Sequence, residues 1–259
     1  MDIAAQALIQ LQMYLMVLAR IGGVFGFAPV FGSHNIPRQA KIALSLVLAL
    51  VIFPGIPLSP GDHWNSLPSY AFCIGKEIVV GVIIGYVAAL ITTAMQLAGQ
   101  FIDMQIGFGL VNIVDPVSGT QVTVIGQLHY IIAILLFLKT NSHHLLLTAV
   151  SESYQLVPVD GSFLGEICQS GLVALFGKMF SLAFKIAAPV TCALLLTDIV
   201  LAVMARAVPQ MNVFIVGFPL KIFAGLFILA VTIPAVIGIL GQSFHGLGQS
   251  IALILGSVR

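Results

Sequence analysis

The chain contains charge-free apolar stretches that are too long for the interior of an ordinary soluble domain. After Lys221, for example, no charged residue occurs before Arg259. A helix needs about 20 mostly apolar residues to cross the hydrocarbon core of a bilayer. Helices that are apolar on all sides are buried in lipid or in a larger assembly. The sequence therefore predicts a polytopic membrane-type protein, or a subunit that partners cover on nearly all sides.

The overall composition points to the same class. Hydrophobic residues make up 59% of the 259 residues, charged residues make up only 7%, and the mean hydropathy is +1.12. Because a soluble domain carries about 25% charged residues, this chain could not cover its own surface with charge. A soluble enzyme and a disordered chain are thereby excluded. A net charge of +1 gives no general attraction to nucleic acid, so no nucleic-acid partner is expected.

The apolar runs predict an all-α fold with about six long helices arranged in hairpins. No strand-like alternation of period two persists along the chain. Residues 139–170 form the most polar part, where we expect a loop with one short helix. The six runs are 3–31, 42–57, 71–98, 124–138, 171–205 and 213–255.

Residues 99–123 do not suit one straight helix, because four glycines and an Asp-Pro pair interrupt an apolar context. Such backbone is tolerated at membrane depth where it is buried in protein or lines a cavity. The segment is therefore either a broken or re-entrant element that faces a pathway, or an ordinary loop with an Asp-Pro turn. The spacing alone leaves both interpretations open. The residues concerned are Gly99, Gly107, Gly109, Asp115, Pro116 and Gly119.

Four charged residues fall inside apolar runs: Arg20, Glu77, Lys185 and Asp198. An ionised side chain at the centre of a bilayer is unfavourable, so each should be paired, protonated or turned toward protein or water. Asp198 with Lys185 or Arg20 is a candidate ion pair. These residues are either structural pairs or helix-end residues, or they are parts of a proton relay, although a relay usually needs several carboxylates or histidines on one path.

No motif for catalysis, cofactor binding or metal binding is present. The sequence lacks the HExxH, P-loop, Rossmann and GxSxG patterns, and it offers no nucleophile with a neighbouring base. We therefore expect a protein that is not an enzyme and that has no cofactor. Two small-residue pairs, Gly22 with Gly26 and Gly81 with Gly85, predict close packing between helices.

Several motif blocks occur in a fixed order along the chain. The N-terminal half contains Ala19-Arg20-Ile21-Gly22-Gly23, Ala28-Pro29-Val30-Phe31-Gly32, Ile36-Pro37 and Glu77 followed by Gly81 and Gly85. The middle contains Gln96-Leu97-Ala98-Gly99-Gln100, Asp103-Met104-Gln105-Ile106-Gly107-Phe108-Gly109 and Val114-Asp115-Pro116. The C-terminal half contains Arg206-Ala207-Val208-Pro209-Gln210-Met211-Asn212-Val213-Phe214 and Val216-Gly217-Phe218-Pro219-Leu220. Together these blocks resemble the FliR/SctT family of type III secretion export-gate subunits, and 217–220 is closer to its flagellar branch.

The resemblance implies an N-terminal region over 1–170 that is similar to FliP and a C-terminal hairpin over 171–259 that is similar to FliQ. It implies a flagellar export gate in the bacterial inner membrane, within the basal body and partly raised above the bilayer plane. In that gate several copies of FliP and FliQ surround a single subunit of this family, and FlhB lies on the cytoplasmic side. Unfolded substrates pass through the gate, and lipid is a further neighbour.

The resemblance also implies two functional segments. A plug near 103–123 would close the pore, with Asp103, Gln105, Gly107, Phe108, Gly109, Asp115 and Pro116 as plug or pore-lining residues. The turn with Arg206, Pro209, Gln210 and Asn212 would contact FlhB. The alternatives are a virulence secretion subunit similar to SctT, a secondary transporter, and a membrane scaffold without a pathway. The sequence shows no convincing repeat of the kind that many transporters carry.

Overall fold

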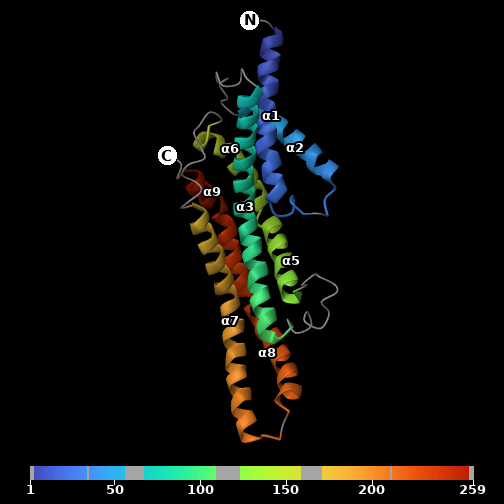
Figure 1. Ribbon diagram of the computed structural model, residues 1–259, viewed down its shortest axis with the longest axis vertical. Helices are drawn as coiled ribbons and strands as arrows, with labels where there is room; N and C mark the ends of the chain where they lie inside the picture. The colour runs from blue at the N-terminus through green and yellow to red at the C-terminus, as the bar shows by residue number, and fades with distance from the viewer. Residues whose placement is uncertain are drawn as a thin grey trace. The chain divides into compact units, whose positions relative to one another are not determined.

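The computed structural model describes most of the chain, and the described part is built from helices and their connections without a strand. The described residues are 3–33, 35–55, 67–108, 123–158, 171–210 and 212–256. The elements are α1 (Ile3–Phe27), α2 (Arg38–Ile52), η1 (Phe53–Gly55), α3 (Leu67–Ile106), α5 (Val124–Lys139), α6 (Ser142–Leu156), α7 (Gly171–Ala207), α8 (Val213–His245) and α9 (Leu247–Gly256) (Figure 1). The all-α prediction is confirmed.

The observed helices follow the predicted apolar runs closely. Within the described residues, five helices are long and apolar enough to cross a membrane, and the bent pair α5 and α6 would make a sixth. The polar region holds one helix, α6, in agreement with the prediction. Two details differ from the predictions. Helix α3 continues to Ile106, so the first part of the glycine-rich segment is helical. The last run is divided into α8 and α9 near residue 246.

The helices form two compact units that do not follow the order of the chain. The first unit comprises 1–90, 137–175 and 244–259, and the second comprises 91–136 and 176–243. Each unit thus takes residues from both sides of position 170. The division into 1–170 and 171–259 rests on the resemblance and stays a prediction.

Glycines let α1 and α3 approach closely in the first unit, where α1 lies along the first half of α3 (Figure 1). A Cβ atom at Gly23 would meet backbone atoms of α3, and one at Gly81 or Gly85 would meet backbone atoms of α1. Nothing lies within 4 Å of the equivalent position at Gly22 or Gly26. Of the two predicted small-residue pairs, the one on α3 therefore packs inside the chain, and Gly23 takes the corresponding place on α1.

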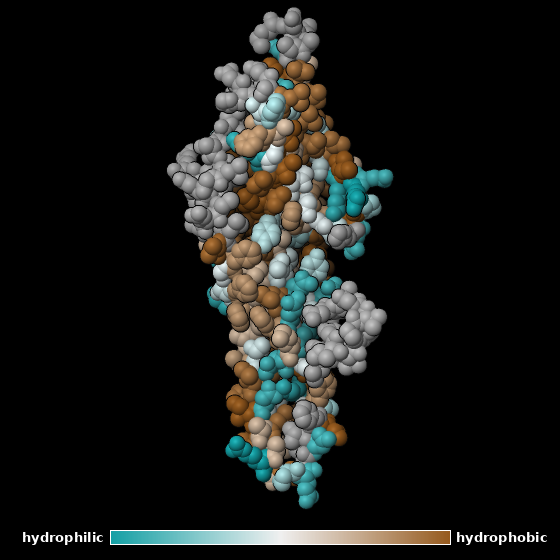
Figure 2. All heavy atoms as spheres, in the orientation of Figure 1, coloured by the Kyte–Doolittle hydropathy of each residue, from teal (hydrophilic) through white to brown (hydrophobic). Residues whose placement is uncertain are grey.

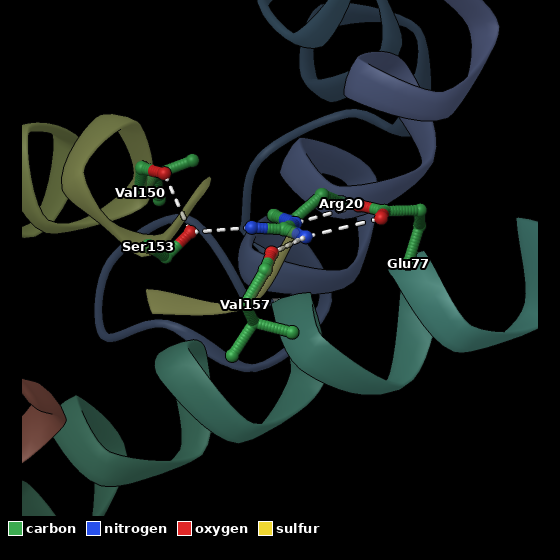
Figure 3. A network of polar contacts seen from close by, with 5 residues as sticks. All are labelled: Arg20, Glu77, Val150, Ser153 and Val157. Atoms are coloured by element: carbon green, nitrogen blue, oxygen red, sulfur yellow. Dashed lines mark hydrogen bonds and ion pairs between the residues drawn. The ribbon is translucent and has the colours of Figure 1, made fainter. Parts of the chain in front are cut away.

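A buried ion pair joins α1 to α3 beside this contact (Figure 3). The Arg20 Nε donates to Oε2 of Glu77 at 2.6 Å, and Nη2 donates to Oε1 at 3.0 Å. Arg20 is 0% exposed and Glu77 is 2% exposed. The two parallel hydrogen bonds are the strong bidentate arrangement of a guanidinium with a carboxylate. Both charges are therefore neutralised inside the unit, away from any solvent.

The remaining donors of Arg20 bind the end of α6 and the residue that follows it (Figure 3). Nη1 donates to Oγ of Ser153 at 2.7 Å, and Nη2 also donates to the carbonyl oxygen of Val157 at 3.1 Å. The Ser153 hydroxyl in turn donates to the carbonyl oxygen of Val150 at 2.6 Å. The guanidinium carbon lies 3.7 Å from the centroid of the Tyr154 ring, which is cation–π geometry. One side chain thus fixes α1, α3 and α6 together.

The second unit contains the antiparallel hairpin of α7 and α8, and much of its surface is apolar. Figure 2 shows hydrophobic residues over much of the face that it draws. Large apolar side chains that are more than half exposed include Leu195, Leu196, Ile199, Val200 and Val203 on α7, and Ile215, Phe223, Phe227 and Val231 on α8. A surface of this kind marks contact with lipid or with other protein chains.

Replacing Arg20 with methionine should strongly destabilise the chain. The variant leaves the Glu77 carboxylate buried without its cation, and breaking a buried pair in this way costs about 3–5 kcal/mol. We expect a lower thermal midpoint for the chain in isolated membranes, followed as the loss of detergent-extractable chain on heating. The double variant Arg20→Met/Glu77→Leu should lose less stability, since no unpaired charge remains.

The matched control for this prediction is Arg38→Met, because Arg38 is an exposed arginine at the start of α2. Its thermal midpoint should equal that of the unchanged chain. A thermal midpoint for Arg20→Met that matches the control would contradict the importance of the buried pair.

Candidate functional site

The predicted plug residues begin in the last turn of α3, within the second unit. Asp103 is buried, while Gln105, Gly107 and Phe108 are half-buried. Three further predicted plug residues, Gly109, Asp115 and Pro116, lie outside the described residues. The structure therefore describes the helical base from which the predicted plug departs, and the start of α5 to which it returns.

The carboxylate of Asp103 binds the first turn of α5. Its Oδ1 and Oδ2 accept the backbone N–H of Ile125 at 3.2 and 3.1 Å, and Oδ2 accepts the N–H of Gly126 at 3.2 Å. The first four N–H groups of a helix have no partner within the helix. An acidic side chain at this end is also favoured by the helix dipole. Asp103 therefore links the end of α3 to the start of α5.

Two glycines allow the backbones of α3 and α5 to meet at this point. A Cβ atom at Gly99 would clash with the backbone of Gly126, and one at Gly126 would clash with the side chain of Thr123. Both glycines are buried. These are positions at which only glycine fits, because the opposing atoms belong to the backbone or to a short side chain.

A third glycine ends α3. Gly107 has a φ of +101°, and its N–H and that of Phe108 both donate to the carbonyl oxygen of Asp103, at 3.1 and 3.0 Å. A residue with positive φ just beyond the last turn is the common way to stop a helix. The ring of Phe218 on α8 would lie 2.8 Å from a Cβ atom at Gly107. The chain therefore leaves α3 at a defined point and in a defined direction.

The predicted pairing of Asp198 is wrong. Asp198 Oδ1 is paired with Nζ of Lys221 on α8 at 2.6 Å, and not with Lys185 or Arg20. The side-chain amide of Gln105 donates to Oδ2 of Asp198 at 3.1 Å, so the last turn of α3 joins the pair. The side chain of Asp198 is 39% exposed. Lys185 is also exposed, in contrast to the expected burial, because its side of α7 faces away from the rest of the unit.

Lys221 is a functional candidate that the sequence reasoning missed, although a signal was present. Asp198 lies 11 residues before Pro209, and Lys221 lies 11 residues after Gln210. Residues at equal distances from the turn of an antiparallel hairpin lie opposite each other. Since α7 and α8 form such a hairpin, the symmetry about residues 209–210 pairs the two charges.

The turn of the hairpin is exposed. Arg206 lies in the last turn of α7, and Pro209, Gln210 and Asn212 follow it before α8 begins. All four residues are exposed in the chain. The carbonyl oxygen of Asn212 accepts the N–H of Ile215 at 3.1 Å, which starts α8. The turn is thus available for contact with another protein.

The described residues contain no group of three histidine, cysteine, aspartate or glutamate side chains that could hold a metal ion. The charged residues that the described helices bring into contact are Arg20 with Glu77 and Asp198 with Lys221. Asp103 contacts the start of α5 instead of a cation.

Comparison with known proteins places the chain in a family. A model of the family described as "Bacterial export proteins, family 1" matches residues 11–247. The flagellar biosynthetic protein FliR of Bacillus subtilis is 37% identical over 234 residues, which is 89% of this chain and 90% of the relative. FliR of Escherichia coli is 25% identical over 230 residues, 87% of this chain and 86% of the relative.

A relative from another secretion system also matches. The Yop proteins translocation protein T of Yersinia pestis is 28% identical over 211 residues, which is 80% of this chain and 80% of the relative. The family model covers most of the chain, and the Bacillus relative shares more than a third of its residues over nearly the full length. This protein therefore belongs to the bacterial export proteins, family 1, the FliR/SctT family of the type III export apparatus.

Proposed function

We propose that this chain is a subunit of the flagellar type III protein export gate in the bacterial inner membrane. In this proposal one copy assembles with several copies of FliP and FliQ into a closed pore for unfolded flagellar substrates, and FlhB contacts it on the cytoplasmic side. The observation that carries the proposal is the 37% identity with a flagellar biosynthetic protein over 89% of the chain. The role is that of a channel component and not of an enzyme.

The exposed apolar surface of the second unit supports a function inside an assembly. Only 17% of the most apolar stretch of α8 is buried within the chain, compared with 56% of the corresponding stretch of α3. Exposed apolar surface of this extent has to be covered by lipid or by neighbouring chains. FliP and FliQ helices would supply such neighbours.

The lengths of the helices support a position partly outside the bilayer. At 1.5 Å per residue, the 40 residues of α3 extend about 60 Å and the 37 residues of α7 about 55 Å. The hydrocarbon core is only about 30 Å thick. Even with strong tilt, a substantial part of each helix lies beyond it. We infer that the gate projects from the bilayer plane.

Two alternatives lead to different expectations. A virulence secretion subunit has less support than a flagellar one. The Yersinia translocation protein is 28% identical to this chain, whereas the flagellar relative from Bacillus subtilis is 37% identical. A secondary transporter should be stable when it is purified alone. A gate subunit should instead require its partners, since its apolar hairpin is incomplete without them.

Co-expression with FliP and FliQ should yield one stable complex that contains this chain. We expect the chain alone to be recovered poorly or as aggregates in mild detergent, because the exposed faces of α7 and α8 lack their cover. Native mass spectrometry of the purified material checks the composition. A monodisperse, stable chain without FliP and FliQ would rule out the gate and favour a transporter.

Deleting residues 108–118 should make the assembled gate leaky. If these residues form the plug, their loss leaves the pore open to ions and small solutes while the helices that hold the complex remain. Planar-bilayer conductance of the purified complex is the measurement, with the undeleted complex as the control. A tightly closed gate after the deletion would remove the plug assignment.

Photocrosslinking groups placed at Val208 and Gln210 should capture FlhB. Both positions are exposed in the turn of the hairpin. Leu195 is the matched control, because it is exposed on α7 but lies about 20 Å from Val208 along the helix axis. Reproducible absence of an FlhB adduct from the two turn positions would sink the contact.

A further inference from the structure

Among the described acidic residues of the second unit, Asp103 is the most deeply buried, and no described cation pairs with it. It is 2% exposed. Among the described residues no ion pair involves it, and its oxygens accept hydrogen bonds from the N–H groups of Ile125 and Gly126 instead. A buried carboxylate needs such donors, because an unpaired buried charge is strongly unfavourable.

The two donors are the second and third N–H groups of α5, which begins at Val124. These are the groups that a side chain at the N-cap normally accepts. In most helices the cap comes from the residue directly before the helix. Here the cap comes from Asp103 on a different helix, 22 positions before Ile125 and 23 positions before Gly126. The same carboxylate therefore caps α5 and ties it to α3.

The surrounding backbone is arranged to bring this carboxylate into place. Gly99 lies one helical turn before Asp103 and faces Gly126, so the two helices approach to backbone contact next to the cap. On the other side, α3 stops at Gly107, and the carbonyl oxygen of Asp103 itself accepts the two N–H groups that close the helix. Asp103 thus takes part in both the end of α3 and the start of α5.

We propose that Asp103 is a positioning residue that holds the start of α5 against the last turn of α3 and thereby fixes the two ends of the connection between these helices. It acts by hydrogen-bonding geometry and not by carrying a proton. The effect on the gate rests on the proposed function, because it requires that this connection contains the plug. The effect on α5 itself does not.

Capping and charge can be separated by substitution at Asp103. Asparagine has the same shape, keeps an oxygen that accepts N–H groups, and caps helices about as well as aspartate does. Alanine removes the acceptor. Asp103→Asn should therefore behave like the unchanged chain, whereas Asp103→Ala should not. A residue that works through its charge or by releasing a proton would lose its role in both variants.

Hydrogen exchange of the complex co-expressed with FliP and FliQ tests the structural part. For peptides that cover the first turn of α5, Asp103→Ala should speed exchange roughly 2- to 30-fold, the range expected for the loss of an N-cap. Asp103→Asn should keep the unchanged rate. Glu152→Ala is the control, because it removes an exposed carboxylate from α6. Unchanged exchange in Asp103→Ala overturns the proposal. Fast exchange in Asp103→Asn overturns it as well, even if Asp103→Ala does not assemble.

Conductance of the same complexes tests the consequence for the gate. We expect Asp103→Ala to leak and Asp103→Asn to stay closed, with unchanged subunit composition in both. A leak in the 108–118 deletion but none in Asp103→Ala would support the plug assignment and overturn the positioning role of Asp103. A closed deletion variant would instead overturn the proposed plug, and hydrogen exchange alone would then decide whether Asp103 holds α5.

Discussion

A charge that packs between the apolar helices of this chain has to find its partner inside the protein. The structure meets this constraint in three different ways: Arg20 binds a carboxylate, Asp103 binds the N–H groups of a helix, and Asp198 binds a lysine and an amide. In each case the contact connects different helices. Because hydrophobic packing is non-directional, these polar contacts are what specify which faces of the apolar helices meet.

The Arg20 contact shows how much one buried group can determine. Its guanidinium uses Nε, Nη1 and Nη2 on partners from α3, α6 and the residue after α6, and its flat face covers Tyr154. A lysine could not make these contacts, since it lacks the planar fork of donors. A buried pair of this kind adds little stability compared with apolar residues of the same size, but breaking it is costly. Its value lies in fixing one arrangement of the first unit.

The sequence predicted the helices well and their pairing poorly, and the two outcomes have one cause. Helix positions follow from the length of charge-free runs, so α1, α7 and α8 begin within a few residues of the predicted starts. Pairing depends on how each helix is rotated, and helices that are apolar all round give little periodic signal for that rotation. The partner of Asp198 and the exposure of Lys185 were missed for this reason.

The candidate site was predictable only in part. The glycines and the Asp-Pro pair marked 99–123 as unusual, but nothing local in the sequence indicates that Asp103 caps a helix more than twenty residues later. A cap from within the same helix can be recognised by its spacing, whereas a cap from another helix requires the tertiary structure. Helix α3 also continued farther than its glycines suggested, because Gly99 serves the packing against α5 and does not end the helix.

The surface of α7 shows why the scarcity of charge finally points to an assembly. Lys178 and Lys185 are exposed and share one face of the helix, since they are seven residues apart, and large apolar side chains are exposed along the same helix. Acyl chains would cover the apolar residues but leave the two ammonium groups unpaired, at a cost of about 2.5–3.5 kcal/mol for each at the bilayer centre. Water would hydrate the lysines but not the apolar residues. Neighbouring protein helices that carry a few carboxylates would satisfy both, so this surface of α7 fits a place inside an assembly of helices better than contact with lipid or water alone.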